Sequence, residues 1–372
     1  MKNVLVTGGL GFIGSHICVE LLQLREPDTQ RHCYKVFIID NLENSKYETL
    51  HKIHEISGDD GESRVNVEVF DLLNADKLRA FFEENSIDTI IHCAGKKAVG
   101  ESVREPLLYY SANLNITLNL LAMVRQHNVS NFIFSSSATV YGNSKENDGS
   151  RLNEMSVVGC NISNPYGKTK YMQEEILQDF YNVHPHLNCY LLRYFNPVGC
   201  HPSGLIGENP NGIPNNLMPY IIRVAANNAS TNLFQEECYK NLTIFGTDYS
   251  TADGTCIRDY IHVCDLARAH IDVLSCRKER SVNVFVFNVG TGRGISVLDM
   301  VKSFEQHNAG VKLPHVTGTR RGGDEEVTVC DNTKITCDTS WRPKYDLMEM
   351  VRHSWNYIKT NYDLVVTTKE TN

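Results

Sequence analysis

The amino-acid sequence predicts an α/β fold, in which a doubly wound parallel sheet is joined to a smaller mixed α/β part. In the first half of the chain, short β-rich runs alternate with helical patterns, which is typical of a parallel sheet with helices on both faces. Several runs are continuously apolar, for example residues 37–39 and 90–91, as expected of strands buried on both faces. A glycine-rich turn separates the first run from the first helical pattern.

The elements of the first half follow in chain order from these runs. Strands are predicted at Val4–Thr7, Val36–Asp40, Val67–Phe70, Thr89–Cys93, Phe132–Ser135 and Cys189–Tyr194. Helices are predicted near residues 12–25, 75–84, 105–126 and 165–182, where apolar side chains recur at helical spacing.

The second half is less regular. Residues 197–219 are rich in Gly, Pro and Asn and are predicted to form loops. Helices are predicted near 217–227, 263–275, 296–307 and 346–360, and strands near 243–245, 260–263 and 284–289. We expect a first domain over residues 1–196 and a smaller mixed α/β domain over 197–372, with some later segments returning to the first sheet.

Gly8, Gly11 and Gly14 lie between a predicted strand and a predicted helix, and this context indicates a ligand-binding loop. The first glycine permits a tight turn, the second lets the backbone approach a pyrophosphate, and the third lets helix and strand pack closely. The fold is therefore predicted to be of the Rossmann type, with a bound dinucleotide. Asp40 ends the second predicted strand, where a carboxylate accepts hydrogen bonds from an adenosine ribose and repels a 2′-phosphate, so NAD is favoured over NADP.

Composition and charge argue against several classes of protein. The 372-residue chain has a net charge of −8 and no strongly basic block, so nucleic-acid binding is not indicated. No apolar run reaches the roughly 18 residues that a membrane span needs. The first strand begins almost at the N-terminus, and a cleaved signal peptide would remove the glycine loop, so a cytoplasmic protein is expected. Twelve cysteines without CxxC spacing indicate neither a metal site nor a disulfide framework.

Tyr166 and Lys170 are four residues apart in a predicted helix and therefore share one of its faces. A free phenol has a pKa of about 10, which a neighbouring ammonium and a bound nicotinamide cation would lower. Ser137 follows the fifth predicted strand, at the carboxyl edge that faces the cofactor crevice in such folds. We interpret the three side chains as a proton-transfer site, in which Ser137 passes a proton or orients the reacting hydroxyl.

A second pair with the same spacing, Tyr141 and Lys145, is the alternative. Gly142, Asn143 and Ser144 follow its tyrosine at once, so this pair is expected in a loop. Pro165, in contrast, precedes Tyr166 as a proline does at a helix start, which favours the later pair.

Five longer stretches are peculiar to one enzyme family: Lys97–Ser102, Phe134–Gly142, Leu192–Pro197, Gly212–Tyr220 and Arg258–His262. Through them the chain resembles the UDP-glucose 4-epimerases, also called UDP-galactose 4-epimerases, of the extended short-chain dehydrogenase/reductase superfamily. The resemblance runs from Val4 to about Trp355. It implies a homodimer that interconverts UDP-galactose and UDP-glucose in galactose metabolism. Inversion at C4 would pass through a 4-keto sugar, with transient hydride transfer to bound NAD.

The resemblance also implies roles for individual residues. Tyr166 would be the base, Lys170 would hold the nicotinamide ribose and lower the pKa of the tyrosine, and Ser137 would contact the sugar 4-hydroxyl. Further cofactor contacts are implied at Gly8, Gly11, Phe12, Ile13, Gly14, Asp40, Asn41, Asn44, Ser45, Asp71, Leu72, Cys93, Ala94, Gly95, Lys97, Ser135, Tyr194 and Phe195. Contacts to the UDP-sugar are implied at Lys97, Thr139, Asn196, Asn216, Leu217, Thr243, Ile244, Phe245, Arg258, Arg321 and Asp324, and the two guanidinium groups suit the diphosphate.

Other interpretations stay open at this point. A related dehydratase would need an acid/base pair where Ala138 and Thr139 stand, and a decarboxylase or a non-catalytic NAD-binding protein would share the fold. Thr328 occupies a position where a small residue is associated, within the family, with acceptance of N-acetylated sugars, so UDP-N-acetylhexosamines are an additional expected substrate class. The apolar stretch 116–124 is a candidate dimer contact, with burial in the core as the alternative.

Overall fold

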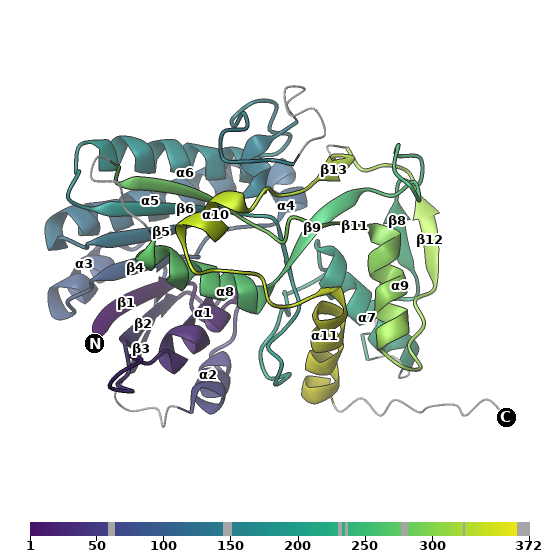
Figure 1. Ribbon diagram of the computed structural model, residues 1–372, viewed down its shortest axis with the longest axis horizontal. Coiled ribbons are helices and arrows are strands. Elements are labelled where there is room, and N and C mark those ends of the chain that lie inside the picture. Colours follow the sequence, from purple (N-terminus) through teal and green to yellow (C-terminus); the bar gives the residue numbers. More distant parts are fainter. Residues whose placement is uncertain are drawn as a thin grey trace.

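The computed structural model describes residues 1–58, 64–143, 151–229, 233–234, 237–276, 282–322 and 324–362. Its centre is a seven-stranded parallel sheet in the order β10-β6-β5-β4-β1-β2-β3 (Figure 1). The strands are β1 (Lys2–Thr7), β2 (Tyr34–Asp40), β3 (Val65–Val69), β4 (Thr89–His92), β5 (Asn131–Ser137), β6 (Asn188–Tyr194) and β10 (Val284–Val289).

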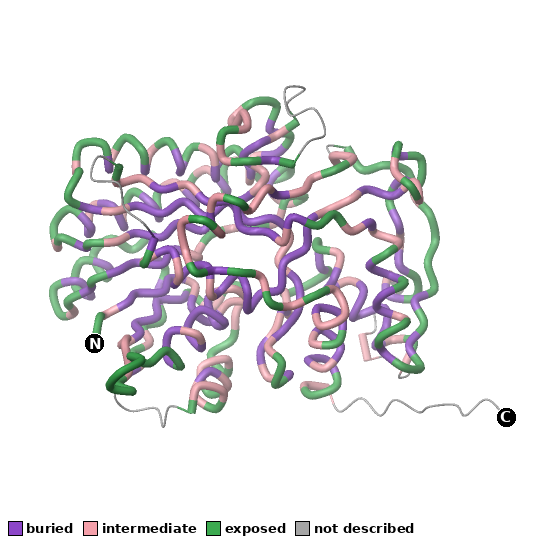
Figure 2. Tube along the Cα trace, viewed as in Figure 1, coloured by how far each residue is buried: buried purple, intermediate pink, exposed green. Residues whose placement is uncertain are grey.

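Helices cover both faces of this sheet. On one face α1 (Phe12–Gln23) packs against α2 (Thr49–Ser57) and α8 (Val263–Asp272), and on the other α5 (Pro106–His127) contacts α3 (Ala75–Glu84) and α6 (Pro165–Asn182). Successive side chains of β1 enter different cores, because a strand alternates its side chains between faces: Val4 and Val6 join one cluster and Leu5 the other. Figure 2 shows the buried strands between helices whose outer surfaces are exposed.

The strand order creates a crevice at one edge of the sheet. From β1 the chain runs outward to β2 and β3, and then returns to β4 on the other side of β1. Ligands of such sheets bind beyond the carboxyl ends of the strands, beside the point where the order reverses. The glycine loop follows β1, and β5 ends in the serine run at this same edge.

A smaller part of the molecule lies beside this edge (Figure 1). Four short strands form a mixed sheet, and two more form a parallel pair: β7 (Asn196–Val198), β9 (Ile257–His262), β11 (Gly294–Ser296) and β13 (Val327–Thr328), and then β8 (Leu242–Phe245) and β12 (His315–Gly318). A third apolar core joins them to α7 (Leu217–Ala229), α9 (Val297–His307) and α11 (Leu347–Tyr362).

The predicted fold class is confirmed, with the large parallel sheet and the smaller mixed part both present. Strand β10 pairs with β6 and α8 packs on α1, so both of these late segments belong to the large sheet. The division of the chain at Asn196 stays a prediction. Several short elements were not predicted, because few residues carry their pattern: α2, α4 (Val99–Arg104), α10 (Thr333–Asp338), β7 and β11 to β13.

Helix α5 is, among the described residues, the one helix long and apolar enough in composition to cross a membrane. Half of that apolar stretch is buried within the protein. Ile116, Leu120 and Val124 lie in the core cluster beneath α3 and α6. The composition of α5 therefore reflects packing against the sheet, and the stretch 116–124 serves the core.

Candidate active site

The glycine loop has the geometry that a bound pyrophosphate requires. Gly8 has a φ of +68°, and its amide donates to the Ile39 carbonyl at 2.8 Å, which ties the turn to β2. A Cβ on Gly14 would lie 2.2 Å from the Gly8 carbonyl oxygen, so only glycine lets α1 pack this close. Helix α1 begins at Phe12 without a side-chain cap, which leaves its first amides available to an anion.

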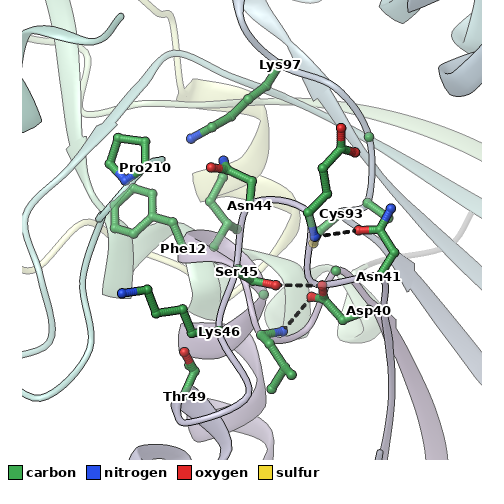
Figure 3. Close-up of a pocket in the computed structure, with 18 of the residues that line it drawn as sticks. Phe12, Asp40, Asn41, Asn44, Ser45, Lys46, Thr49, Cys93, Lys97 and Pro210 are labelled. Atoms are coloured by element: carbon green, nitrogen blue, oxygen red, sulfur yellow. Dashed lines mark hydrogen bonds between the residues drawn. The ribbon is translucent and has the colours of Figure 1, made fainter. Parts of the chain in front are cut away.

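A cavity of about 1160 Å³ extends from this loop along the carboxyl ends of β1, β2 and β4 (Figure 3). Most of the predicted cofactor contacts line it: Gly8, Gly11, Phe12, Ile13, Gly14, Asp40, Asn41, Asn44, Ser45, Asp71, Leu72, Cys93, Ala94, Gly95 and Lys97. The lining of this cavity does not include Ser135, Tyr166, Lys170, Tyr194 or Phe195. Ser135, Lys170 and Tyr194 interact with Cys93, which does line the cavity. Tyr166 lies at the start of α6, and Phe195 directly follows β6.

Asp40 holds the two loops of the cavity together. Its carboxylate accepts hydrogen bonds from the Leu10 amide at 3.0 Å and the Ser45 hydroxyl at 2.7 Å (Figure 3). It also accepts from the Leu42 amide at 2.9 Å. A carboxylate has about four acceptor positions. One is therefore left for a ribose hydroxyl, so the Asp40 side chain both shapes the cavity and can bind an adenosine within it.

Lys170 is buried where the serine run meets the cavity. Its ammonium donates to the Ser135 carbonyl at 2.7 Å and lies 4.6 Å from the centre of the Phe134 ring. The Ser135 hydroxyl in turn donates to the Cys93 sulfur at 3.2 Å. This chain of contacts connects α6 to the cofactor cavity through β5.

Tyr166, at the start of α6, and Ser137, at the end of β5, lie close enough for Ser137 to lower the pKa of the phenol. The Ser137 hydroxyl oxygen already accepts from the Thr139 amide at 3.2 Å and from the Thr139 hydroxyl at 3.0 Å. Since its acceptor positions are used, the Ser137 proton is directed toward the Tyr166 oxygen or toward a substrate oxygen. Asn164 caps α6 by accepting from the Gly167 amide at 2.8 Å, which fixes the first turn that carries Tyr166.

The electrostatic influences on this pair differ from the sequence-based expectation. Burial raises the pKa of the Tyr166 phenol, and the hydrogen bond with Ser137 opposes that rise. Burial lowers the pKa of Lys170 to about 8, which Cys93 and Glu174 partly offset. The contact with Ser137 therefore favours the phenolate, and the lowering of the Tyr166 pKa by Lys170 stays a proposal.

A buried ion pair supports the serine run from behind. Arg193 on β6 donates to Glu174 on α6 through Nε at 3.0 Å and Nη2 at 2.6 Å, and the Ser136 hydroxyl donates to the same carboxylate at 2.5 Å. Arg193 also reaches the Tyr141 hydroxyl at 3.3 Å, and this hydroxyl donates to Asn288 at 2.6 Å. The Tyr141 side chain, on the short 3₁₀ turn Ala138–Tyr141, therefore has a structural role. Lys145, the other member of the alternative pair, lies outside the described residues.

The predicted UDP-sugar contacts form two groups. Arg258 and Arg321 both pair with Asp324, at 3.7 Å and 2.9 Å, and Arg321 lies 5.2 Å from the centre of the Phe245 ring. Phe245 ends β8, which also carries Thr243 and Ile244. The second group adjoins the cofactor cavity: Asn216 donates to Glu208 at 3.1 Å, just before Leu217 opens α7. Asn196 donates instead to the Asp259 carbonyl at 3.0 Å.

Two polar residues near the cavity were missed by the sequence analysis. Glu208, nearly buried, pairs with Lys97 at 2.8 Å. Asn113 on α5 accepts from the Lys96 amide at 2.8 Å and donates to Thr169 at 3.0 Å, which holds the loop after β4 against α6. A polar residue within the apolar α5 was a signal for Asn113, whereas Glu208 lies in an irregular loop where no local pattern marks it.

Comparisons with known proteins agree with this arrangement. The model of the NAD dependent epimerase/dehydratase family matches residues 4–290. A UDP-glucose 4-epimerase of Cyamopsis tetragonoloba is 43% identical over 360 residues, which is 97% of this chain and 96% of that protein. The crystal structure of UDP-glucose 4-epimerase from Bifidobacterium longum, in complex with NAD⁺ and UDP, is 41% identical with a TM-score of 0.85 and covers 97% of this chain and 99% of that one.

A UDP-Glc/GlcNAc 4-epimerase from Campylobacter jejuni is also similar in structure, at 32% identity and a TM-score of 0.77 over 97% of this chain and the whole of that one. The glycine loop, the tyrosine–lysine pair and the long stretches quoted above thus occur in a chain that aligns end to end with these enzymes. The chain belongs to the NAD-dependent epimerase/dehydratase family and, within it, to the UDP-glucose 4-epimerases.

Proposed function

We propose that this protein is an NAD-dependent isomerase that interconverts UDP-galactose and UDP-glucose by inverting C4 of the hexose, a step of galactose metabolism. The observation that carries the proposal is the placement of Tyr166, at the start of α6, next to Ser137, at the carboxyl end of β5, near a cavity lined by the glycine loop. A proton-transfer group next to a hydride acceptor is the arrangement that oxidation of a sugar alcohol needs.

NAD fits the residues of the cavity. The first amides of α1, which has no side-chain cap, would hold the diphosphate, and Lys97 provides a cation 6.0 Å from the ring of Phe12 on the same cavity. Asp40 retains an acceptor position for the adenosine ribose and would repel a 2′-phosphate. When bound, NAD accepts the C4 hydride and later returns it, so each turnover regenerates the cofactor, and we expect the purified protein to carry it.

The chain's own residues handle the proton and the sugar. Tyr166, as phenolate, takes the proton of the 4-hydroxyl directly or through Ser137, whose own proton is free to be donated. The resulting 4-keto sugar turns about its link to the diphosphate and presents its other face, after which Tyr166 returns the proton. Arg258 and Arg321 suit the diphosphate, since guanidinium forks match phosphate oxygens. Firm binding of UDP and loose binding of the hexose make this turn feasible.

The test is a comparison of two tyrosine variants. Tyr166→Phe removes the proposed acid/base group and should lower kcat by roughly 10²–10⁴-fold while NAD stays bound. Tyr141→Phe removes a hydroxyl that bonds Asn288 and Arg193, so it should lower stability by about 1 kcal/mol with kcat within a fewfold of wild type. Turnover is measured with UDP-galactose and no added NAD, with NMR of the products. Near-normal turnover by Tyr166→Phe, or a dehydrated or decarboxylated product, would contradict the proposal.

The substrate range extends, we propose, to UDP-N-acetylhexosamines. Thr328 is a small side chain on β13, paired in register with Arg258 of β9, so it lies beside a residue proposed to bind the diphosphate. The similar Campylobacter jejuni enzyme is described as acting on both kinds of sugar. Conversion of UDP-N-acetylglucosamine should be lost in Thr328→Tyr while UDP-galactose is still converted. Failure of the wild-type protein to convert the N-acetylated sugar, at enzyme levels that readily convert UDP-galactose, would remove this extension.

We also propose a homodimer, formed by α4 and the start of α5. Apolar side chains are exposed there: Val99, Val103, Leu107 and Leu108, with Leu107 81% exposed. Contiguous exposed apolar side chains of this kind mark protein interfaces. Sedimentation should give twice the mass of the chain, and Leu107→Glu should give the single mass. A wild-type monomer at micromolar concentration would contradict this proposal.

A cytoplasmic location is proposed on the state of the cysteines. None of the twelve forms a disulfide bond, and seven of them are buried within the fold. Unpaired thiols in this number are typical of a reducing compartment. Titration of the unfolded protein, prepared without reductant, should find all twelve thiols free.

A further inference from the structure

An irregular segment of the smaller part, residues 207–212, forms one side of the cofactor cavity; we call it the strap. Gly207, Glu208, Asn209 and Pro210 line the same cavity as the glycine loop. Figure 3 shows Pro210 near Phe12, with Lys97 and Asn44 around the same space. The strap therefore lies opposite the loop on which the diphosphate of the cofactor is proposed to bind.

The strap is fastened to the large sheet at two points. Glu208 pairs with Lys97 at 2.8 Å, close to the proposed diphosphate position. Farther along, the Asn211 amide donates to Asn44 at 3.1 Å and the Asn211 side chain donates to the Glu43 carbonyl at 2.9 Å. Asn44 follows Asp40 in the turn after β2, where the adenosine ribose is proposed to bind. The strap thus spans the cavity from the diphosphate to the ribose.

A buried arginine holds the strap from its other side. Arg223 of α7 is 7% exposed, and its guanidinium donates to the Gly212 carbonyl at 2.5 Å and to the Pro210 carbonyl at 2.6 Å. It also donates to the Tyr239 hydroxyl at 2.7 Å, which fixes the plane of the guanidinium. Two charge-assisted bonds to carbonyls two residues apart set the path of the backbone between them.

We propose that Arg223 and Asn211 are positioning residues that keep the strap closed over the bound dinucleotide and so set the rate at which NAD leaves. This inference rests on the proposed function, because it takes the ligand of the cavity to be NAD. A dinucleotide between the glycine loop and the strap is released only after the strap separates from Lys97, Asn44 and Glu43. Each bond that fastens the strap therefore adds to the barrier for release.

The experiment measures the release of NAD from the purified, loaded protein by exchange into an excess of isotopically labelled NAD. Asn211→Ala removes one exposed hydrogen bond and should speed release about fivefold. Arg223→Met removes two charge-assisted bonds and should speed it by about 100-fold or more. Asn188→Ala is the matched control. The Asn188 side-chain amide also donates to the Ser130 carbonyl and to Asn131, but Asn188 begins β6, at the end of the sheet away from the cofactor cavity.

Several outcomes decide the matter. Faster release from Asn211→Ala, with unchanged thermal unfolding and with turnover restored by added NAD, supports the strap, since a general loss of structure would change all three. Release at the wild-type rate from Asn211→Ala overturns it, even where Arg223→Met fails to fold. A wild-type protein that neither carries nor binds NAD contradicts the proposed function as well, whereas loaded variants that exchange like wild type contradict the strap alone.

Discussion

Lys170 is buried, and burial of its positive charge destabilises the folded protein. It is 6% exposed, and burial lowers its pKa from 10.5 to about 8. One pKa unit corresponds to about 1.4 kcal/mol, so the charge destabilises the fold by roughly 3 kcal/mol at neutral pH. The hydrogen bond to Ser135 recovers part of this. Such a charge is retained at an active site because the chemistry needs it.

Lys170→Met should therefore stabilise the cofactor-free protein while abolishing turnover. Because the folded pKa lies below the unfolded one, the unfolded chain binds more protons between pH 8 and 10.5, and wild-type stability rises with pH across that window. The variant should be about 2 kcal/mol more stable than wild type at pH 7, with the difference shrinking toward pH 10. Urea unfolding of both proteins at pH 7, 8, 9 and 10 measures it. A variant less stable than wild type by the same amount at every pH would contradict the assignment.

At the residue scale, the sequence was sufficient to predict the positions of the residues that belong to motifs. Tyr166, Ser137 and Asp40 lie where their motifs predicted, since their positions follow from one helix start and two strand ends. Glu208 and Asn113 were missed, because their importance depends on partners more than fifteen residues away along the chain. Burial, which raises the pKa of Tyr166, is a property of the folded molecule and is not visible in the sequence.

At the scale of elements, helix α1 packs unusually close to the turn that follows β1. A Cβ on Gly14 would meet the Gly8 carbonyl oxygen at 2.2 Å and the Gly9 Cα at 2.8 Å, and both are backbone atoms that cannot rotate away. The contact between β1, its turn and α1 is therefore possible with glycine alone.

Gly14→Ala should displace α1 and empty the cofactor site. Overpacking of this kind destabilises by about 1–3 kcal/mol. Gly100→Ala on α4 is the control, because its nearest heavy atoms are side-chain ends at 3.9 Å, and alanine in a helix should stabilise by about 0.5–1 kcal/mol. Denaturant unfolding and NAD content of the purified proteins are the measurements. A Gly14→Ala protein with a full complement of NAD would show that the close contact is not required.

Long, strongly patterned elements were predicted well, and short ones were not. The strands of the large sheet carry runs of Val, Ile and Phe, and α6 and α9 carry periodic apolar faces. β11 and β13 have three and two residues, so no period can be read from them. Their pairing with β9 is decided by the segments that surround them.

Across the whole molecule, four histidines join its two parts: His16 on α1, His201 after β7, His262 on β9 and His353 on α11. His262 and His353 are 3.0 Å apart between ring nitrogens, and the rings of His16 and His201 are 6.3 Å apart. Burial lowers the pKa of all four, to about 3 for His16 and about 4 for His201. The junction is therefore built of neutral imidazoles.

Acid should weaken this junction. Below about pH 6.5 the unfolded chain takes up protons that the folded chain does not, so stability falls as pH decreases, by at most ~1.4 kcal/mol per pH unit for each histidine. Glu20, whose pKa burial raises to about 7, acts in the opposite sense, so the variant comparison isolates the histidine. Between pH 6 and pH 5, the His201→Asn variant should lose about 1 kcal/mol less unfolding free energy than the wild type. His51→Asn, on the exposed side of α2, should leave it unchanged. Equal slopes for wild type and His201→Asn would contradict this account.

The sequence by itself determined the α/β class and the family, and it placed the glycine loop, Tyr166, Lys170 and Ser137 on their elements, because each of these depends on residues close together along the chain or on long shared stretches. Only the tertiary structure decided which groups surround them: Glu208 paired with Lys97, Arg223 bonded to the strap, Ser137 near Tyr166 and the histidines between the two parts. Those contacts join residues far apart in sequence, and their strength comes from the exclusion of water, which no local pattern of residues can specify.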